Sequence, residues 1–129
     1  MKFMLMMNGP RNAYAEFGKL SPDDLKAHFG FMQRFSKELQ HNGELVAAEG
    51  LADPMQAVIV RAGKGGAPEV TDGPFAEAKE FLAGYWIVDV DNVQRAYEIA
   101  ARASAAPGAG GAPLNLPLEV REVMSGPPE

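Results

Sequence analysis

The stretch from Phe81 to Val90 most restricts how this chain can fold, because it is apolar on both faces of the strand it predicts. Aromatic and β-branched residues dominate its centre, as is typical of strands. Its odd positions carry Phe81, Ala83, Tyr85 and Ile87, and its even positions carry Leu82, Trp86, Val88 and Val90. An antiparallel sheet with one face in water should alternate apolar and polar residues. The strand is therefore expected to be covered on both faces, and the apolar run at residues 2–7 suggests the same for a first strand.

A first long helix is predicted after Ser21-Pro22-Asp23-Asp24. Ser21 can cap the helix, Pro22 suits its first turn, and the two aspartates favour its positive end. The expected apolar stripe consists of Leu25, Phe29, Met32, Phe35 and Leu39. Gly43 supplies a left-handed stop.

A second helix is predicted to begin at Asp91-Asn92-Val93-Gln94, which resembles a capping box. Its expected apolar stripe consists of Val93, Ala96, Tyr97 and Ala100. The helix should end before Pro107, where a loop rich in glycine, alanine and proline begins.

Further strands are predicted at residues 45–48, 57–61 and 118–123, with a short one at 69–71 after a Gly63–Gly66 turn. Asn8-Gly9-Pro10 should end the first strand, a polar connection should precede the long helix, and Pro117 suggests an edge strand or a bulge. The order of elements resembles a ferredoxin-like α+β sandwich, an antiparallel sheet with two helices. Right-handed crossovers would place both helices on one face of the sheet.

Two helices on one face leave the other apolar face uncovered. A second copy of the chain is the simplest cover, so we expect a homodimer packed through the open sheet face. The alternative is a monomer with one helix on each face of the sheet.

Composition fits one domain over residues 1–129, with a frayed tail at 124–129. The chain has no cysteine, which excludes disulfides and thiolate chemistry. Its net charge of −5 argues against nucleic-acid binding. The apolar N-terminal run is too short for a signal peptide or a membrane span. We therefore expect a cytoplasmic protein that does not contact a membrane.

Residues 72–80, Asp-Gly-Pro-Phe-Ala-Glu-Ala-Lys-Glu, followed by the strand at 82–90, resemble the signature of DGPF-domain proteins, a branch of the YCII-related family. The opening residues 1–5, the helix end at 43–45 and residues 48–51 also match. The resemblance implies a dimeric α+β barrel of ferredoxin-like subunits. Some DGPF proteins are associated with extracytoplasmic-function sigma factors, which implies a protein partner in transcription control.

The YCII-related family is suspected of catalysis through a histidine in the first helix and an aspartate after the second. The family's histidine position falls near Met32, and His28 lies one turn earlier. After the second helix, Ser104-Ala105-Ala106-Pro107 offers no acid. The paired residues are absent from this sequence, so any chemistry must use other side chains.

Asp72 is the candidate catalytic residue, as a general acid or base at a turn beside the sheet. The structural alternative is an Asx-turn or helix-capping aspartate, with Gly73 at positive φ and Pro74 fixing the bend. Phe75 is a candidate binding residue that stacks on a ligand, and the alternative places it in a dimer core.

Glu77 and Lys79 are candidate binding residues, because with Glu80 they would supply a carboxylate pair and an ammonium that binds an acidic substrate. The alternative is a solvated segment with weak ion pairing. Glu49 stands out as a carboxylate among small residues, and it either faces a pocket or lies on the surface.

The two histidines, His28 and His41, are expected to be structural. They lie 13 positions apart on one helix, about 20 Å along its axis, so they cannot share a metal. Gly63-Lys64-Gly65-Gly66 lacks the features of a phosphate loop. We therefore expect no metal and no cofactor.

Three hypotheses remain from the sequence. The first is an enzyme that moves a proton on a small organic molecule, with Asp72 as the acid or base and Glu77, Lys79 and Glu49 lining the cleft. The second is a non-catalytic ligand-binding or regulatory module linked to sigma-factor control. The third is a dimer in which the Asp-Gly-Pro-Phe motif serves only the fold.

Overall fold

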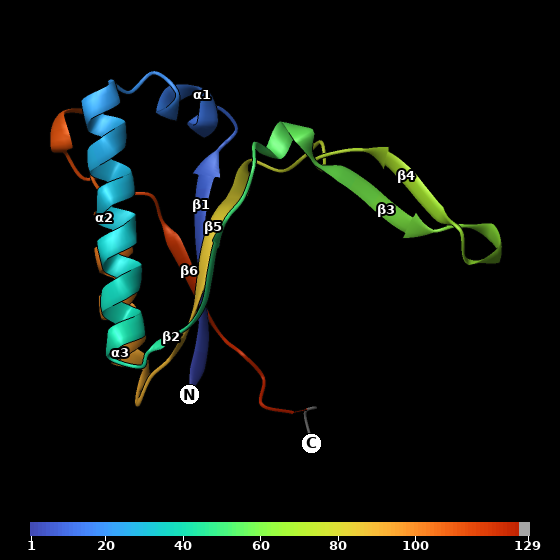
Figure 1. Ribbon diagram of the computed structural model, residues 1–129. Coiled ribbons are helices and arrows are strands. Elements are labelled where there is room, and N and C mark those ends of the chain that lie inside the picture. The colour runs from blue at the N-terminus through green and yellow to red at the C-terminus, as the bar shows by residue number, and fades with distance from the viewer. Residues whose placement is uncertain (127–129) are drawn as a thin grey trace.

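The computed structural model describes residues 1–126, and its main body is an antiparallel sheet with helices on one side (Figure 1). The strands are β1 (Lys2–Pro10), β2 (Leu45–Gly50), β3 (Val58–Ala62), β4 (Pro68–Asp72), β5 (Glu80–Asp89) and β6 (Leu118–Glu122). The helices are α1 (Ala13–Phe17), α2 (Pro22–His41) and α3 (Val93–Ser104), with short 3₁₀ turns η1 (Pro54–Gln56), η2 (Lys64–Gly66) and η3 (Ala109–Gly111).

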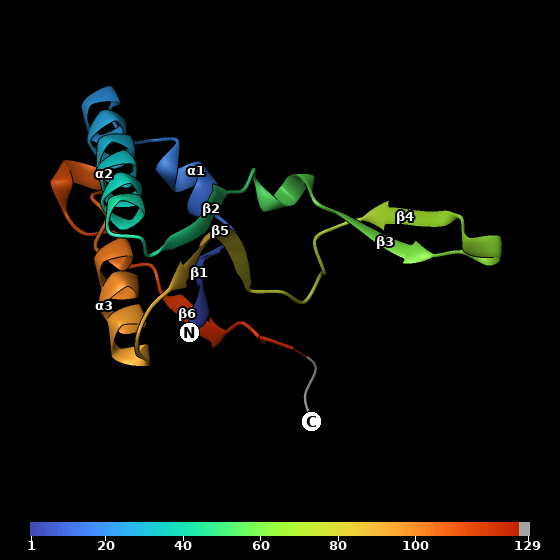
Figure 2. The same cartoon turned by 60° about the horizontal axis from the view of Figure 1, so that its bottom comes forward.

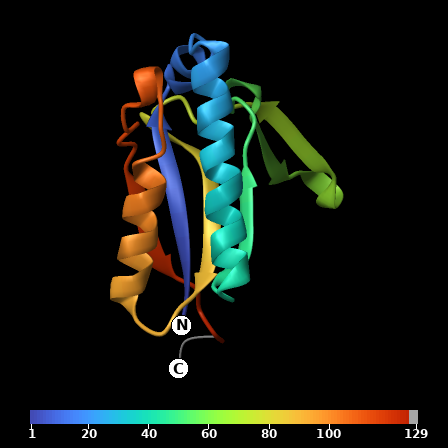
Figure 3. The same cartoon turned by 60° about the vertical axis from the view of Figure 1, so that its left-hand side comes forward.

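The four-stranded sheet has the order β2-β5-β1-β6, with all neighbours antiparallel. The strand with two apolar faces, β5, therefore has a neighbouring strand on each side. The helices α2 and α3 lie side by side on one face of this sheet (Figure 3). The ferredoxin-like α+β arrangement is thus confirmed, with the sheet open in the single chain. The alternative of one helix on each face is wrong.

The ends of the long helices follow the capping signals of the sequence. Ser21 Oγ accepts a hydrogen bond from the Asp24 amide at 3.1 Å, and Asn92 Oδ1 accepts one from the Arg95 amide at 2.9 Å. Gly43 has a φ of +79°, the left-handed conformation that ends α2.

Both helices turn a slightly different face to the sheet than expected. On α2 the buried residues are His28, Phe35 and Leu39, whereas Phe29 is 58% exposed. On α3 the buried residues are Ala96, Ile99, Ala100 and Ala103, whereas Tyr97 is exposed. The expected stripes were therefore wrong at Phe29 and Tyr97, because His28 on α2 and Ile99 on α3 occupy core-facing positions instead.

The core lies between this helix layer and the sheet. Its largest fully buried side chains are Phe35, Leu5, Leu39, Ile99 and Val88. On the strands, Phe3, Leu5 and Met7 of β1 alternate toward the helices, as do Trp86 and Val88 of β5. Burial of these residues ties β1 and β5 to both helices.

A β-bulge near one end of β5 changes the expected alternation. Met7 pairs with Gly84 but Asn8 pairs with Leu82, so Ala83 is an extra residue in β5. Phe81 is consequently buried with the even-numbered residues further along the strand. The strand β1 also continues through Asn8-Gly9-Pro10, which was expected to end it, because these residues pair with residues 80–82 of β5.

The largest departure from the sequence prediction is the hairpin of β3 and β4. These strands form a separate two-stranded sheet instead of joining the main one. The hairpin extends away from the body, on the side of the main sheet opposite the helices (Figures 1 and 2). The short helix α1, where only a polar connection was expected, is a second difference.

The C-terminal residues 123–126 follow β6 without regular structure and are exposed. The predicted fraying of the tail extends to residues 127–129, which lie outside the described residues. None of the helices within residues 1–126 has the length and apolar character needed to cross a membrane.

A bidentate ion pair joins α3 to the turn before β2. Arg95 Nε and Nη2 each donate to a Glu44 carboxylate oxygen at 2.8 Å, and the Glu44 side chain is 16% exposed. The hydrogen bonds from Arg95 lower the pKa of Glu44 below its ordinary value of 4.5. Because the folded pKa lies below the unfolded one, the stabilisation is complete above the unfolded pKa and is lost as pH falls through the folded pKa.

Replacing Glu44 with glutamine is expected to lower the free energy of unfolding by about 1–2 kcal/mol near neutral pH. Urea denaturation of both proteins measures it, and the difference should shrink as pH falls below the pKa of Glu44. Glu98→Gln is the control, because Glu98 contacts the same arginine with its side chain 65% exposed and should cost less than about 0.5 kcal/mol. Equal losses for the two variants would contradict the prediction.

Candidate functional site

The face of the main sheet that the helices leave open carries a central apolar strip. Met4 and Met6 of β1 alternate with the buried residues and point to this face, as do Tyr85 and Ile87 of β5. The register places Met6 beside Tyr85 and Met4 beside Ile87. All four are only partly exposed in the single chain. We call this surface the open face.

Charged side chains flank the apolar strip on the neighbouring strands. Glu49 of β2 pairs with Tyr85 and is exposed, so this predicted binding residue lies on the open face. On the other side, Glu119 pairs with Met6 and accepts a hydrogen bond from Asn8 Nδ2 at 3.1 Å. The open face thus has an apolar centre and a polar margin.

Asp72, the predicted acid, is the last residue of β4 and pairs with Val58 of β3. It is exposed, and within residues 1–126 no hydrogen bond to its carboxylate is present. The structural alternative, an Asx turn or a helix cap, is therefore not what the structure has. Its carboxylate is available to a ligand, but the single chain does not enclose it.

The glycine after Asp72 is required by a close approach and not by positive φ, which was the expectation. The Gly73 amide donates to the Ala57 carbonyl at 2.9 Å. A Cβ at position 73 would lie 3.0 Å from that same oxygen. The Gly73–Pro74 peptide bond is cis. The hydrogen bond and the close approach between Gly73 and Ala57 bring the two ends of the hairpin together beside Asp72.

The three other predicted binding residues follow in the segment that returns to β5. Phe75 is 63% exposed, and its carbonyl accepts from the Ala78 amide at 3.1 Å. Glu77 and Lys79 are exposed, and in the described part of the chain neither forms an ion pair. The structure therefore brings Asp72, Phe75, Glu77 and Lys79 into one exposed segment, while Glu49 lies apart on the sheet.

A second group of side chains, missed by the sequence reasoning, fixes the base of the hairpin. The Arg11 guanidinium lies 5.1 Å from the centroid of the Phe81 ring, and its Nη1 lies 3.3 Å from the sulfur of Met55. Met55 belongs to η1, before the hairpin, and Phe81 is the second residue of β5, the strand after it. Arg11 therefore contacts both segments that connect the hairpin to the body.

Tyr14 of α1 lies in the same region. Its hydroxyl donates to the Leu51 carbonyl. Burial, and to a lesser extent the negative charge of Asp53, raises the pKa of Tyr14. The sequence predicted only a polar connection at residues 13–17, where the structure has α1. Arg11 and Tyr14 were missed as contacts of the hairpin base for that reason.

The chain was also compared with models of known protein families. A model of the YCII-related domain matches residues 1–112 of the chain. The chain belongs to the YCII-related family. No curated protein matches it closely enough to supply a function.

The histidine and aspartate suspected of catalysis in the YCII-related family have no counterpart here. Met32, near which the family's histidine position is expected, packs against the core. Ser104, the last residue of α3, donates its hydroxyl to the Leu116 carbonyl at 2.7 Å. The first is apolar and the second is bound to backbone, so proton transfer in this YCII-related chain requires different residues.

His28 has a structural role, as expected. It is only 7% exposed, and its Nδ1 lies 3.0 Å from the Pro107 carbonyl, to which it donates in the corresponding tautomer. Its ring makes edge contacts with Phe17 and Phe29, at centroid distances of 4.8 and 5.4 Å. His28 thereby ties α2 to α1 and to the loop after α3. His41 lies exposed in the last turn of α2.

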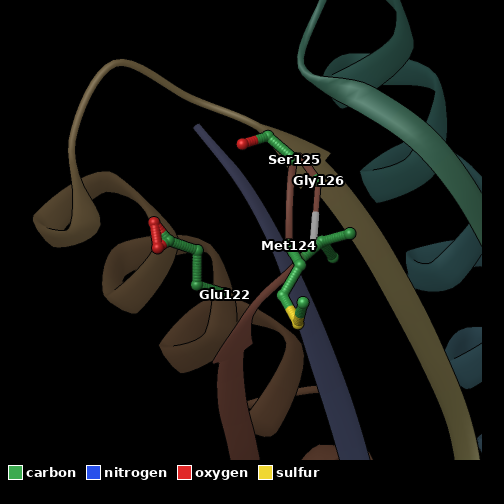
Figure 4. Close-up of a pocket in the computed structure, with 5 residues that line it drawn as sticks. Glu122, Met124, Ser125 and Gly126 are labelled. Carbon is green, nitrogen blue, oxygen red and sulfur yellow. The ribbon is translucent and has the colours of Figure 1, made fainter. Parts of the chain in front are cut away.

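Two surface depressions lie away from the predicted site. One, of about 260 Å³, is lined by residues 122–126 after β6 (Figure 4). The other, of about 520 Å³, lies along α2 between positions 29 and 40. Neither is lined by Asp72, Glu49, Phe75, Glu77 or Lys79. A search of residues 1–126 finds no group of three or more histidine and carboxylate side chains that could hold a metal.

Proposed function

We propose that this YCII-related chain is a homodimer, formed through the open face, that binds a small organic molecule and moves a proton on it with Asp72. The apolar strip of Met4, Met6, Tyr85 and Ile87 supports the dimer, because face-to-face packing would remove it from water. Each Å² of apolar surface so buried contributes roughly 25 cal/mol before the cost of association.

The observation that carries the proposal is the free carboxylate of Asp72. A general acid or base needs a carboxyl group that backbone amides do not occupy, and Asp72 meets this condition in the described chain. Lys79, a few residues along, supplies a positive charge suited to an acidic substrate, and Phe75 supplies an aromatic surface for it. Glu77 adds a second carboxylate, and Glu49 contributes from the open face.

Proton transfer can be tested without knowing the natural substrate. Small keto acids and other carbonyl compounds are incubated with the protein in D₂O, and deuterium uptake at the carbon next to the carbonyl is followed by NMR. We expect uptake faster than in protein-free buffer for at least one compound. Asp72→Asn should lower that rate by about 100-fold or more.

Asp91→Asn is the matched control, since Asp91 is an exposed aspartate next to α3, and it should leave the rate unchanged. Deuterium uptake no faster than in buffer across the panel, or equal rates in wild type and Asp72→Asn, would count against proton transfer by Asp72.

The second candidate function is a non-catalytic regulatory module linked to sigma-factor control. The exposed apolar side chains of the hairpin and of Phe75 favour it, as does the absence of any enclosure of Asp72 by residues 1–126. This function requires a protein partner. Capture of no specific protein from a native lysate by the immobilised wild-type chain would oppose it.

A further inference from the structure

The hairpin of β3 and β4, residues 58–72, has one apolar face with nothing packed on it. We call this hairpin the arm. Val60 pairs directly with Val70, and Val58 points to the same face two residues earlier. These three valines are 57–58% exposed. The opposite face carries the pairs Ile59–Thr71 and Arg61–Glu69.

An isolated two-stranded hairpin is at most marginally stable in water, and it needs a further layer to cover its apolar face. The rest of the described chain does not provide that layer, since β3 and β4 pair only with each other. Yet the roots of the arm are well fixed, through the Gly73–Ala57 hydrogen bond and the contacts of Arg11. A firmly rooted arm with an uncovered apolar face is suited to docking on another molecule.

The direction of the arm favours a second copy of this chain as that molecule. The arm leaves the body on the side of the open face, as both Figure 1 and Figure 2 show. A second copy packed on the open face, about 10 Å from the first sheet, lies on the side toward which the arm extends. In a two-fold dimer both arms make the same contact.

We propose that the apolar face of the arm docks on the second copy and encloses Asp72 against it. Asp72 pairs with Val58 and so shares the face of the three valines. A partner that covers these valines also covers Asp72. The site is therefore composite: one chain supplies the acid, and the partner supplies the wall that excludes water. This inference rests on the proposed dimer.

The docking contact is tested by Val60→Asp, with Thr71→Asp as the control on the opposite face of the same arm. Both positions are exposed in the single chain, so both variants should fold, as circular dichroism can verify. Sedimentation should show a dimer weakened by about tenfold or more for Val60→Asp, and an unchanged dimer for Thr71→Asp. If Val60→Asp dimerises as tightly as the wild-type protein, this face of the arm does not dock on the second copy.

Contact across the two chains can be observed directly because the chain has no cysteine. A spin label is attached to Lys64→Cys at the tip of the arm, and this protein is mixed with ¹⁵N-labelled wild type. Broadening of the wild-type amides then reports only intermolecular proximity, and we expect it on the sheet strands. A dimer without broadening would overturn the arm contact and leave the dimer intact, whereas a monomeric wild type would overturn both.

Enclosure of Asp72 is measured by the reactivity of single cysteines toward a thiol reagent. Asp72→Cys should be protected in the dimer and should react freely when combined with Val60→Asp. Thr71→Cys, on the opposite face, should react freely in both backgrounds. Equal reactivity of the two cysteines in the dimer would contradict the composite site.

Discussion

Replacing Phe35 with alanine is expected to lower the free energy of unfolding by about 3–5 kcal/mol. Phe35 is 1% exposed and lies where α2 meets the sheet. Its ring stacks on Phe31 at 5.7 Å between centroids and meets Trp86 edge-on at 5.9 Å. The Arg102 guanidinium lies 5.0 Å from its centroid. The substitution removes all three aromatic and cationic contacts and leaves a cavity that close-packed neighbours refill only in part.

Urea denaturation of the two proteins measures this loss. Phe29→Ala is the matched control, since it removes the same side chain from the same helix at a position that is 58% exposed. It should cost less than about 1.5 kcal/mol, because Phe29 has only edge contacts with Phe17 and His28. Similar losses for both variants would mean that the buried face of α2 is not the one described.

Replacing Ile87 with aspartate is expected to raise the dissociation constant of the proposed dimer by about 100-fold or more. Ile87 lies at the centre of the open face, between Met4 of β1 and Ala47 of β2. Its side chain is partly exposed in the single chain, so a carboxylate there remains hydrated in a monomer. Packing of a second sheet would remove that water and leave the charge unpaired. Sedimentation over a range of concentrations measures the effect.

Gln94→Asp is the control, because it places the same charge on the exposed surface of α3 and should leave the dimer unchanged. Circular dichroism verifies that both variants fold. A wild-type chain that remains monomeric at micromolar concentration would remove the basis of the prediction. An Ile87→Asp protein that dimerises like wild type would place the interface elsewhere.

The parts of the fold that the sequence predicts well are those decided by local chemistry. Ser21 and Asn92 cap their helices, and Gly43 ends α2, because each acts on backbone groups within a few residues. The two apolar faces of β5 also predict that both are covered; the helices cover one of them, and Tyr85 and Ile87 lie on the open face.

Features that depend on distant residues were not predictable in the same way. The spacing of the apolar residues from Leu25 to Leu39 allows either Phe29 or His28 to face the core. In the structure, the Pro107 carbonyl, 79 positions away in the chain, contacts the His28 ring and stabilises its buried position. The bulge at Ala83 likewise depends on the pairing of β5 with β1. Such choices are settled by tertiary contacts, which periodicity alone does not contain.

In the candidate site, too, the sequence predicts what local residues decide and misses what depends on distant ones. The sequence identified the segment from Asp72 to Lys79, and the structure keeps these residues together. The sequence did not show that β3 and β4, the strands before this segment, form a sheet of their own, since both have the composition of ordinary sheet strands. Nor did it find Arg11, whose contacts with Met55 and Phe81 join residues 44 and 70 positions away in the chain.

The two outer strands of the main sheet set a limit on how chains can associate. The strand β6 is short, follows Pro117 and carries Glu119, Arg121 and Glu122. The other outer strand, β2, is interrupted by the extra residue Val46 in its pairing with β5. Charges, proline and irregular pairing all hinder a further strand from adding to an edge. The sheet is thus protected against growth into a fibre, and contact through its face would give an assembly that ends at two chains.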